Sequence, residues 1–228
     1  PLFGLFNAAM GVTTVIPEMD FTRPARANPQ SIIEVVTDQD VTQSFGSPAF
    51  WNTVSRHCVA SGIKLPTLRR VLSAGAPVSP DVLRRVNASI ANDGEIHTPY
   101  GATEALPIAS ISAADVLGAT AQGDEGTVAH SNRGGGTCVG RRFSGIQWRI
   151  IRISDDPIDS IDAAEVLPQG EIGELIVQGR VVTREYVTST GANRFHKIAD
   201  GDAFWHRMGD VGYLDDRDRF WFCGRKSH

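Results

Sequence analysis

The first hundred residues alternate short apolar runs with amphipathic segments. Between the apolar runs, Asn28, Ser47 and Ser79 each precede a proline, which predicts an N-cap followed by proline at the first helical position. Gly62 and Gly94 are predicted to end two of these helices. The apolar runs, predicted to be buried strands, are Thr13–Ile16, Val41–Phe45, Arg70–Ser73 and Glu95–Thr98. Alternation of strand and helix predicts an α/β fold with a parallel, helix-covered sheet.

The opening segment, Pro1 to Pro17, carries no charge. It has no basic leading residues, and polar or glycine positions interrupt a run that is already shorter than the roughly 20 residues of a membrane span. We therefore expect a buried helix followed by the buried strand Thr13–Ile16, and no transmembrane segment.

The second half changes character. Residues 118–136 are rich in Gly, Ala, Asp and Ser, which predicts a long loop. The strand-like segments beyond it are separated by turn-rich pieces and favour an antiparallel, β-rich unit. These segments are Ile146–Ile153, Glu174–Gln178, Val211–Leu214 and Phe220–Cys223. We expect an α/β portion over residues 1–117, a loop over 118–136 and a β-rich, distorted barrel-like subdomain over 137–228.

Composition excludes several classes of protein. With 22 basic and 26 acidic residues the net charge is −4, so no basic field for nucleic acid is present. Three distant cysteines show neither CxxC nor metal-ligand spacing, which favours reduced thiols and a cytoplasmic location. The six histidines also lack metal spacing, and Ser73 is not in a GxSxG elbow, which argues against a serine hydrolase.

Two loops follow predicted strands and should lie at one edge of the parallel sheet, where such folds bind ligands. The first, residues 73–77, reads Ser-Ala-Gly-Ala-Pro, and the second, residues 98–104, reads Thr-Pro-Tyr-Gly-Ala-Thr-Glu. Two later segments carry charge beside glycine: residues 206–212 contain Asp210, and residues 224–228 contain Arg225. Alone, Asp210 and Arg225 are typical of solvated turns, and Thr103 and Glu104 could simply cap a following helix.

In this order the segments 98–104, 206–212 and 224–228 resemble the nucleotide-binding set of the adenylate-forming ligases. That family activates carboxylic acids by joining them to AMP from ATP. The resemblance extends over nearly the whole chain, because residues 173–179 are similar to a core strand of the family. It implies the large N-terminal domain of such a ligase, with ATP or AMP and Mg²⁺ as ligands.

The resemblance also implies a role for each motif residue. Tyr100 offers a ring face to adenine, Gly101 and Ala102 let the backbone approach the nucleotide, and Thr103 offers a hydroxyl to phosphate. Glu104 is the expected Mg²⁺ ligand and, with Thr103, takes part in catalysis. We expect Asp210, as an accessible carboxylate between turn-forming glycines, to accept from the ribose hydroxyls, and Arg225 to add a ribose or phosphate contact. The loop Gly75, Ala76 and Pro77 is expected beside adenine and the acyl group.

Within the family the chain resembles the β-lactone synthetases of bacterial long-chain olefin biosynthesis. This resemblance is carried by residues 65–77, 98–107, 205–210 and 221–228. It implies a long-chain fatty or β-hydroxy acid as substrate, an intramolecular lactone closure that releases AMP, and other olefin-pathway enzymes as candidate partners.

Two parts of the family pattern are not found in these 228 residues: the glycine- and Ser/Thr-rich phosphate loop, and the C-terminal lid domain with its lysine. We therefore expect a fragment that ends at the family's hinge. Two alternatives stay open at this point. One is a fatty acyl-CoA ligase, and the other is a non-catalytic nucleotide-binding or scaffold domain, against which the presence of Glu104, Asp210 and Arg225 together argues.

Overall fold

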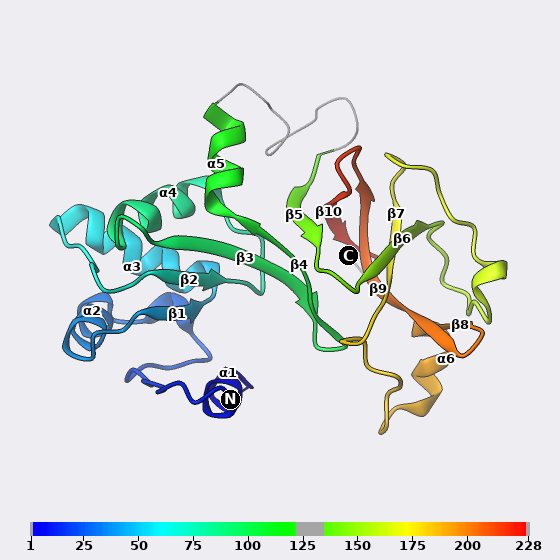
Figure 1. The fold of residues 1–228 in the computed structure, drawn as a ribbon, viewed down its shortest axis with the longest axis horizontal. Helices are drawn as coiled ribbons and strands as arrows, with labels where there is room; N and C mark the ends of the chain where they lie inside the picture. The colour runs from blue at the N-terminus through cyan, green and yellow to red at the C-terminus, as the bar shows by residue number, and fades with distance from the viewer. Residues whose placement is uncertain (1, 122–134, 227–228) are drawn as a thin grey trace. The chain divides into compact units, whose positions relative to one another are not determined.

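The computed structural model of the protein describes residues 2–121 and 135–226, in two compact units. The first unit runs to His97 and the second begins at Thr98, so the division falls inside strand β3 (Glu95–Ala102). Figure 1 labels the elements in chain order. Within the described residues, no helix is both long enough and apolar enough to cross a bilayer.

The first unit is a parallel α/β arrangement, as predicted. Strands β1 and β2 pair in parallel, with Phe45 opposite Leu72, and β2 pairs in parallel with the start of β3, with Leu72 opposite His97. Helices α3 and α4 pack together, and Arg85 of α4 donates to the Asn52 side chain of α3 at 2.6 Å. The elements are α1 (Leu2–Ala9), a 3₁₀ turn (Pro24–Arg26), α2 (Pro29–Asp38), β1 (Gln43–Gly46), α3 (Pro48–Ser61), β2 (Arg70–Ser73) and α4 (Pro80–Ser89).

The three predicted N-caps are confirmed. The side chains of Asn28, Ser47 and Ser79 accept from backbone N–H groups in the first turns of α2, α3 and α4, respectively. Gly62 ends α3 with φ +66°, a left-handed conformation that favours glycine, so its predicted role as a helix stop is also confirmed. The prediction for Gly94 is wrong, because α4 ends at Ser89 and the chain leaves the helix in an extended conformation.

The opening segment is only partly as expected. Helix α1 is present, but Thr13–Ile16 is not a strand and is not buried, since Ile16 is 74% exposed and Met10, just before it, is 66% exposed. An apolar run becomes a strand only when a neighbouring strand pairs with its backbone. None of the described strands pairs with these residues, which explains the failure of the prediction.

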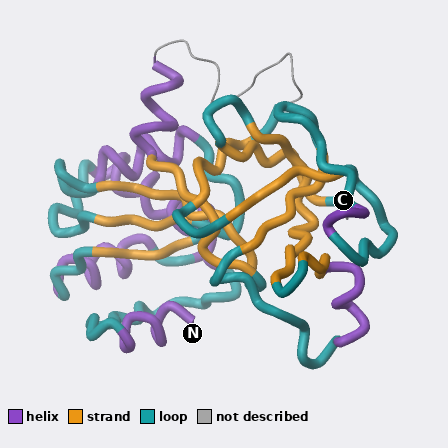
Figure 2. The backbone as a smooth tube through the Cα atoms, turned by 45° about the vertical axis from the view of Figure 1, so that its right-hand side comes forward, coloured by secondary structure: helices purple, strands orange, loops and turns teal. Residues whose placement is uncertain are grey.

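The second unit is rich in strands (Figure 2). Its strands pair antiparallel, which confirms the prediction. Its neighbouring strands follow the order β4-β5-β10-β9-β7-β6, and β8 pairs with β9. Helix α5 continues to Ala121, into the first residues of the expected loop, where alanines favour helix; residues 122–134 of that loop lie outside the described residues. The elements are β4 (Ala105–Ser112), α5 (Ala113–Ala121), β5 (Thr137–Arg142), β6 (Gln147–Ile151), β7 (Gly173–Gln178), α6 (Asn193–His196), β8 (Lys197–Asp200), β9 (Ala203–Leu214) and β10 (Arg219–Arg225), with 3₁₀ turns at Ile161–Ala163 and Thr190–Ala192.

A buried ion pair joins β7 to β9. Glu174 and Arg207 are each 2% exposed, and the Arg207 guanidinium donates to both oxygens of the Glu174 carboxylate. The remaining guanidinium hydrogens go to the carbonyl oxygens of Ser154, Asp156 and Phe195. The arginine is therefore satisfied on every side, and it joins the loop after β6 and helix α6 to the sheet.

Strands β9 and β10 approach so closely at Gly212 that a side chain does not fit. A Cβ atom there would lie 2.0 Å from the carbonyl oxygen of Trp221. We expect Gly212→Ala to lower the free energy of unfolding by about 1–3 kcal/mol, as overpacking does, measured by urea denaturation. Gly191→Ala is the matched control, because its Cβ would meet nothing within 4 Å. Equal stability of the two variants would contradict this prediction.

Candidate active site

The motif at residues 98–104 forms the end of a β-hairpin. Strands β3 and β4 are neighbours joined by the two-residue turn Thr103–Glu104, in which Thr103 is exposed and Glu104 is half-buried. A Cβ atom at Gly101 would lie 2.6 Å from the carbonyl oxygen of Ala105, so this tight hairpin requires glycine. The alternative that Thr103 and Glu104 cap a following helix is wrong, because the element that follows is strand β4.

Asp210 lies in β9 and is bonded on both sides. Its Oδ1 accepts from Nε of Arg225 at 2.8 Å, and its Oδ2 accepts from the hydroxyl of Tyr100. The expectation of an accessible, turn-borne carboxylate is wrong, since the Asp210 side chain is 4% exposed. The physical reason is that β9 continues through this position and Asp210 pairs with Arg225 of β10, while Gly209, with φ +67°, forms an irregularity inside the strand rather than a turn.

Tyr100 connects the hairpin to this carboxylate. Its ring packs against Phe220, with centroids 5.7 Å apart and planes inclined at 42°. Burial and the Asp210 carboxylate raise the pKa of Tyr100 well above its ordinary value. The hydroxyl therefore stays protonated at neutral pH and remains a donor to Asp210.

Glu104 is held by a segment from a distant part of the chain. The hydroxyl of Tyr186 donates to its Oε1 at 3.0 Å, and the backbone N–H of Thr183 donates to its carbonyl oxygen at 2.7 Å. Burial alone would raise the pKa of Glu104. A backbone hydrogen bond, the Tyr186 hydroxyl and the Lys197 charge outweigh that effect and leave the pKa below its ordinary value.

This arrangement fits a magnesium ion. Oε2 of Glu104 has no side-chain hydrogen-bond or ion-pair partner among the described residues, and the carboxylate is ionised at neutral pH. Magnesium takes hard oxygen ligands and commonly uses one or two protein carboxylates together with phosphate oxygens and water. The described residues contain no group of three or more His, Cys, Asp or Glu side chains arranged to hold a metal by themselves. Glu104 could therefore hold Mg²⁺ when a nucleotide supplies the other ligands.

Three residues that sequence reasoning missed surround Glu104: Tyr186, Lys197 and His206. Burial, with the nearby Lys197 charge, lowers the pKa of His206 to about 4, so its ring is neutral at pH 7. The Lys197 ammonium donates to the Thr183 carbonyl oxygen and lies 5.7 Å from the Tyr186 ring centroid. Tyr186 and Glu104 are 82 positions apart in the sequence, and no local sequence pattern around either residue predicts their contact.

Comparison with known proteins identifies the family of the chain. The family described as AMP-binding enzyme matches residues 2–187. The chain belongs to this family. It is 44% identical, over its whole length, to an olefin beta-lactone synthetase of Stenotrophomonas maltophilia and to another of Xanthomonas campestris. The chain spans about 40% of the length of each of these curated relatives.

Solved structures of adenylate-forming enzymes share the fold. The O-succinylbenzoate coenzyme A synthetase of Bacillus subtilis, in complex with AMP, is 20% identical with a TM-score of 0.70, over 99% of this chain and 38% of that protein. The crystal structure of CmiS6 is 22% identical with a TM-score of 0.72, over 98% and 49% respectively. At these identities the similarity supports the predicted fold class alone.

The loop Gly75, Ala76 and Pro77 of this AMP-binding family member follows β2 in the first unit. Gly75 has φ +94°, a conformation that favours glycine. Ser73, at the end of β2, is 2% exposed, and its hydroxyl has no hydrogen-bond partner within residues 2–121 and 135–226. The role of this loop beside adenine and the acyl group stays a prediction.

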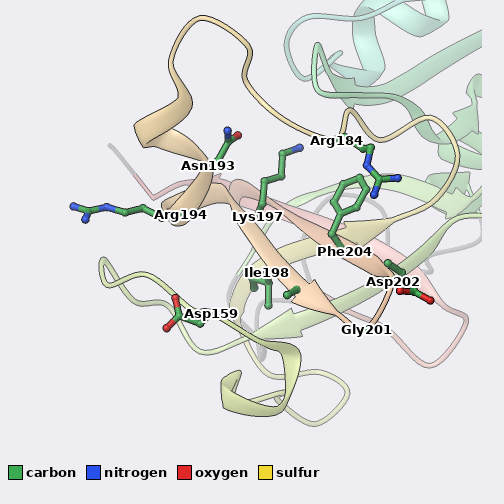
Figure 3. Close-up of a pocket in the computed structure, with 11 residues that line it drawn as sticks. Asp159, Arg184, Asn193, Arg194, Lys197, Ile198, Gly201, Asp202 and Phe204 are labelled. Atoms are coloured by element: carbon green, nitrogen blue, oxygen red, sulfur yellow. The ribbon is translucent and has the colours of Figure 1, made fainter.

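A cavity of about 560 Å³ opens beside α6, β8 and the start of β9. In Figure 3, Lys197 and Arg184 lie close to Phe204, whereas Arg194 points away from them. The basic side chains therefore do not converge on one point. The lining residues are Asp159, Arg184, Asn193, Arg194, Lys197, Ile198, Ala199, Gly201, Asp202, Ala203 and Phe204, none of which sequence analysis assigned to the site.

Proposed function

We propose that the protein uses ATP to activate a long-chain β-hydroxy acid and then closes it to a β-lactone. In the first step the substrate carboxylate attacks the α-phosphorus of ATP, and pyrophosphate leaves to give the acyl adenylate. In the second step the β-hydroxyl oxygen attacks the acyl carbon, AMP leaves, and the hydroxyl proton is released. The first step is typical of the whole family, and the second distinguishes the proposal from that of a coenzyme A ligase.

The observation that carries the proposal is the 44% identity over the whole chain to two olefin beta-lactone synthetases. Relatives named as coenzyme A ligases are less similar: the acyl-CoA ligase azaF of Aspergillus niger is 25% identical over 86% of this chain. The contacts of Asp210 with Tyr100 and Arg225 support a nucleotide site formed by these three side chains, because all three groups can contact ribose, adenine or phosphate.

Asp210 has acceptor positions left for ribose. An ionised carboxylate offers about four lone-pair positions, and the structure uses one on each oxygen. Because the Asp210 side chain is 4% exposed, ribose hydroxyls reach these positions only when Arg225, whose side chain is 49% exposed, turns aside, and Arg225 can then add a contact to ribose or phosphate. The Tyr100 ring would flank adenine, while Gly101 and Ala102 allow close approach of the base.

Phosphate binding is proposed at the tip of the hairpin. The hydroxyl of Thr103 is exposed and can donate to a phosphate oxygen. Glu104 would hold Mg²⁺ through Oε2, the oxygen that Tyr186 does not bond, and that ion would neutralise phosphate charge. The chain's own contribution is to keep the carboxylate ionised and to hold one of its oxygens through the Tyr186 hydroxyl.

One experiment separates lactone formation from coenzyme A transfer. We expect the full-length protein, given ATP, Mg²⁺ and a long-chain β-hydroxy acid, to release AMP and a β-lactone without coenzyme A, with products analysed by mass spectrometry and NMR. The same acid without its β-hydroxyl is the matched control, because it can be adenylated but cannot cyclise. A thioester that forms only with coenzyme A, and no lactone without it, would instead identify an acyl-CoA ligase.

A further inference from the structure

We propose that Tyr186 is a positioning residue that orients the Glu104 carboxylate toward the metal. Asn193 and Lys197 hold the segment that carries Tyr186 in place. This role rests on the proposed binding of Mg²⁺ by Glu104. It goes beyond the motif residues themselves, because Tyr186 lies 82 positions away from Glu104.

The segment 182–186 holds Glu104 through both its backbone and its side chain. Val182 forms an antiparallel bridge with Ala105, the residue directly after Glu104. The N–H of Thr183 donates to the Glu104 carbonyl oxygen at 2.7 Å. The Tyr186 hydroxyl donates a hydrogen bond to Oε1 of Glu104 at 3.0 Å. With the backbone and one carboxylate oxygen fixed, Oε2 is left in a defined orientation.

A second layer fixes the segment itself. The Asn193 side chain accepts from the Tyr186 N–H at 2.8 Å and donates back to the Tyr186 carbonyl oxygen at 3.4 Å. Lys197 donates to the Thr183 carbonyl oxygen and lies against the rings of Tyr186 and Phe204, at 5.7 and 5.4 Å from their centroids. Figure 3 shows Asn193 and Lys197 directed to the same side of the cavity wall.

The chemistry of this contact suits positioning rather than proton transfer. A tyrosine hydroxyl is a donor at neutral pH, and here it donates to Oε1 of Glu104 at 3.0 Å. A donor on one oxygen fixes the rotation of the carboxylate and leaves the other oxygen for the cation. Residues that hydrogen-bond to a metal ligand in this way commonly change metal affinity by about 10- to 100-fold when they are mutated.

The test measures the metal-dependent part of nucleotide affinity. The full-length protein is titrated calorimetrically with a non-hydrolysable α,β-methylene analogue of ATP, with and without Mg²⁺. For Tyr186→Phe we expect the affinity gain from Mg²⁺ to fall about 10-fold, while the affinity without Mg²⁺ is unchanged. A purely structural role would instead weaken both titrations alike. The matched control, Tyr213→Phe, also removes one tyrosine hydroxyl and should leave the gain intact.

Two further variants make the outcome decisive. Glu104→Gln should abolish the gain, and the double variant with Tyr186→Phe should be no weaker than Glu104→Gln alone, because both act through one carboxylate. Asn193→Ala, which keeps the tyrosine but frees its backbone, should lower the gain less than Tyr186→Phe does. It also provides the test if Tyr186→Phe does not fold, and an unchanged gain in a folded Asn193→Ala variant would then overturn the proposal.

The possible failures are distinguishable. A full gain in Glu104→Gln would remove Glu104 from the metal site and, with it, the proposed role of that residue. Loss in Glu104→Gln with a full gain in Tyr186→Phe would overturn the positioning role alone. Additive losses in the double variant would also overturn it.

Discussion

Replacing Glu174 with glutamine is expected to lower the free energy of unfolding of the second unit by about 3–5 kcal/mol, the usual effect of removing one partner of a buried ion pair. The amide keeps the shape of the carboxylate but leaves the Arg207 guanidinium, 2% exposed, without its counter-charge. A domain is stable by only ~5–15 kcal/mol, so the variant should unfold at much lower urea concentration, measured by tryptophan fluorescence.

The matched control is Glu165→Gln, which removes the same charge from the exposed pair with Arg152. Water and salt screen an exposed pair, so this variant should unfold close to the wild type. Replacing both Glu174 and Arg207 with apolar residues should not restore stability, because the carbonyl groups of Ser154, Asp156 and Phe195 would lose their donor. Near wild-type stability of Glu174→Gln would show that water reaches the pair.

Asp210→Asn should weaken binding of AMP to the full-length protein by roughly 10- to 150-fold. That range corresponds to the loss of about 1.5–3 kcal/mol, one charge-assisted hydrogen bond. Asparagine is preferred to alanine here because Asp210 is buried and already bonded to Tyr100 and Arg225, so truncation would also leave the Tyr100 hydroxyl without its acceptor. Calorimetric titration with AMP measures the effect.

Asp215→Asn is the control for Asp210→Asn. Asp215 lies in the turn between β9 and β10, where it accepts from Arg219 and Trp221, and so it changes the same pair of strands without touching the proposed ribose contacts. Thermal melting of both variants separates folding from binding. Wild-type affinity for AMP in Asp210→Asn would exclude this carboxylate from the site.

The features that sequence predicts well here are local. The N-cap before each helix depends on a side chain and a backbone N–H two or three residues apart, so Asn28, Ser47 and Ser79 are readable from sequence alone. The same is true of the left-handed residue Gly62. Strand β2 is also predicted with its observed bounds, because its apolar run is short and clearly delimited.

The features that sequence misses depend on pairing between distant segments. Strand β4 contains Pro107, which normally marks a break, and β8 is four residues long; each is defined by its neighbour in the sheet. The resemblance groups Tyr100, Asp210 and Arg225, which the structure brings into contact, but it does not reveal that Asp210 is buried. The contact between Tyr186 and Glu104 has no local signal at all, because it exists only when the segment 182–186 lies along the hairpin.

The contact between Tyr100 and Asp210 has a thermodynamic consequence. Because the Tyr100 ring is packed on Phe220 and its hydroxyl is bonded to Asp210 before any nucleotide arrives, its rotamer freedom is lost during folding. Immobilising such a side chain on binding would otherwise oppose association by about 0.5–1.5 kcal/mol. The ring therefore loses its conformational entropy when the protein folds, and nucleotide binding does not have to order it.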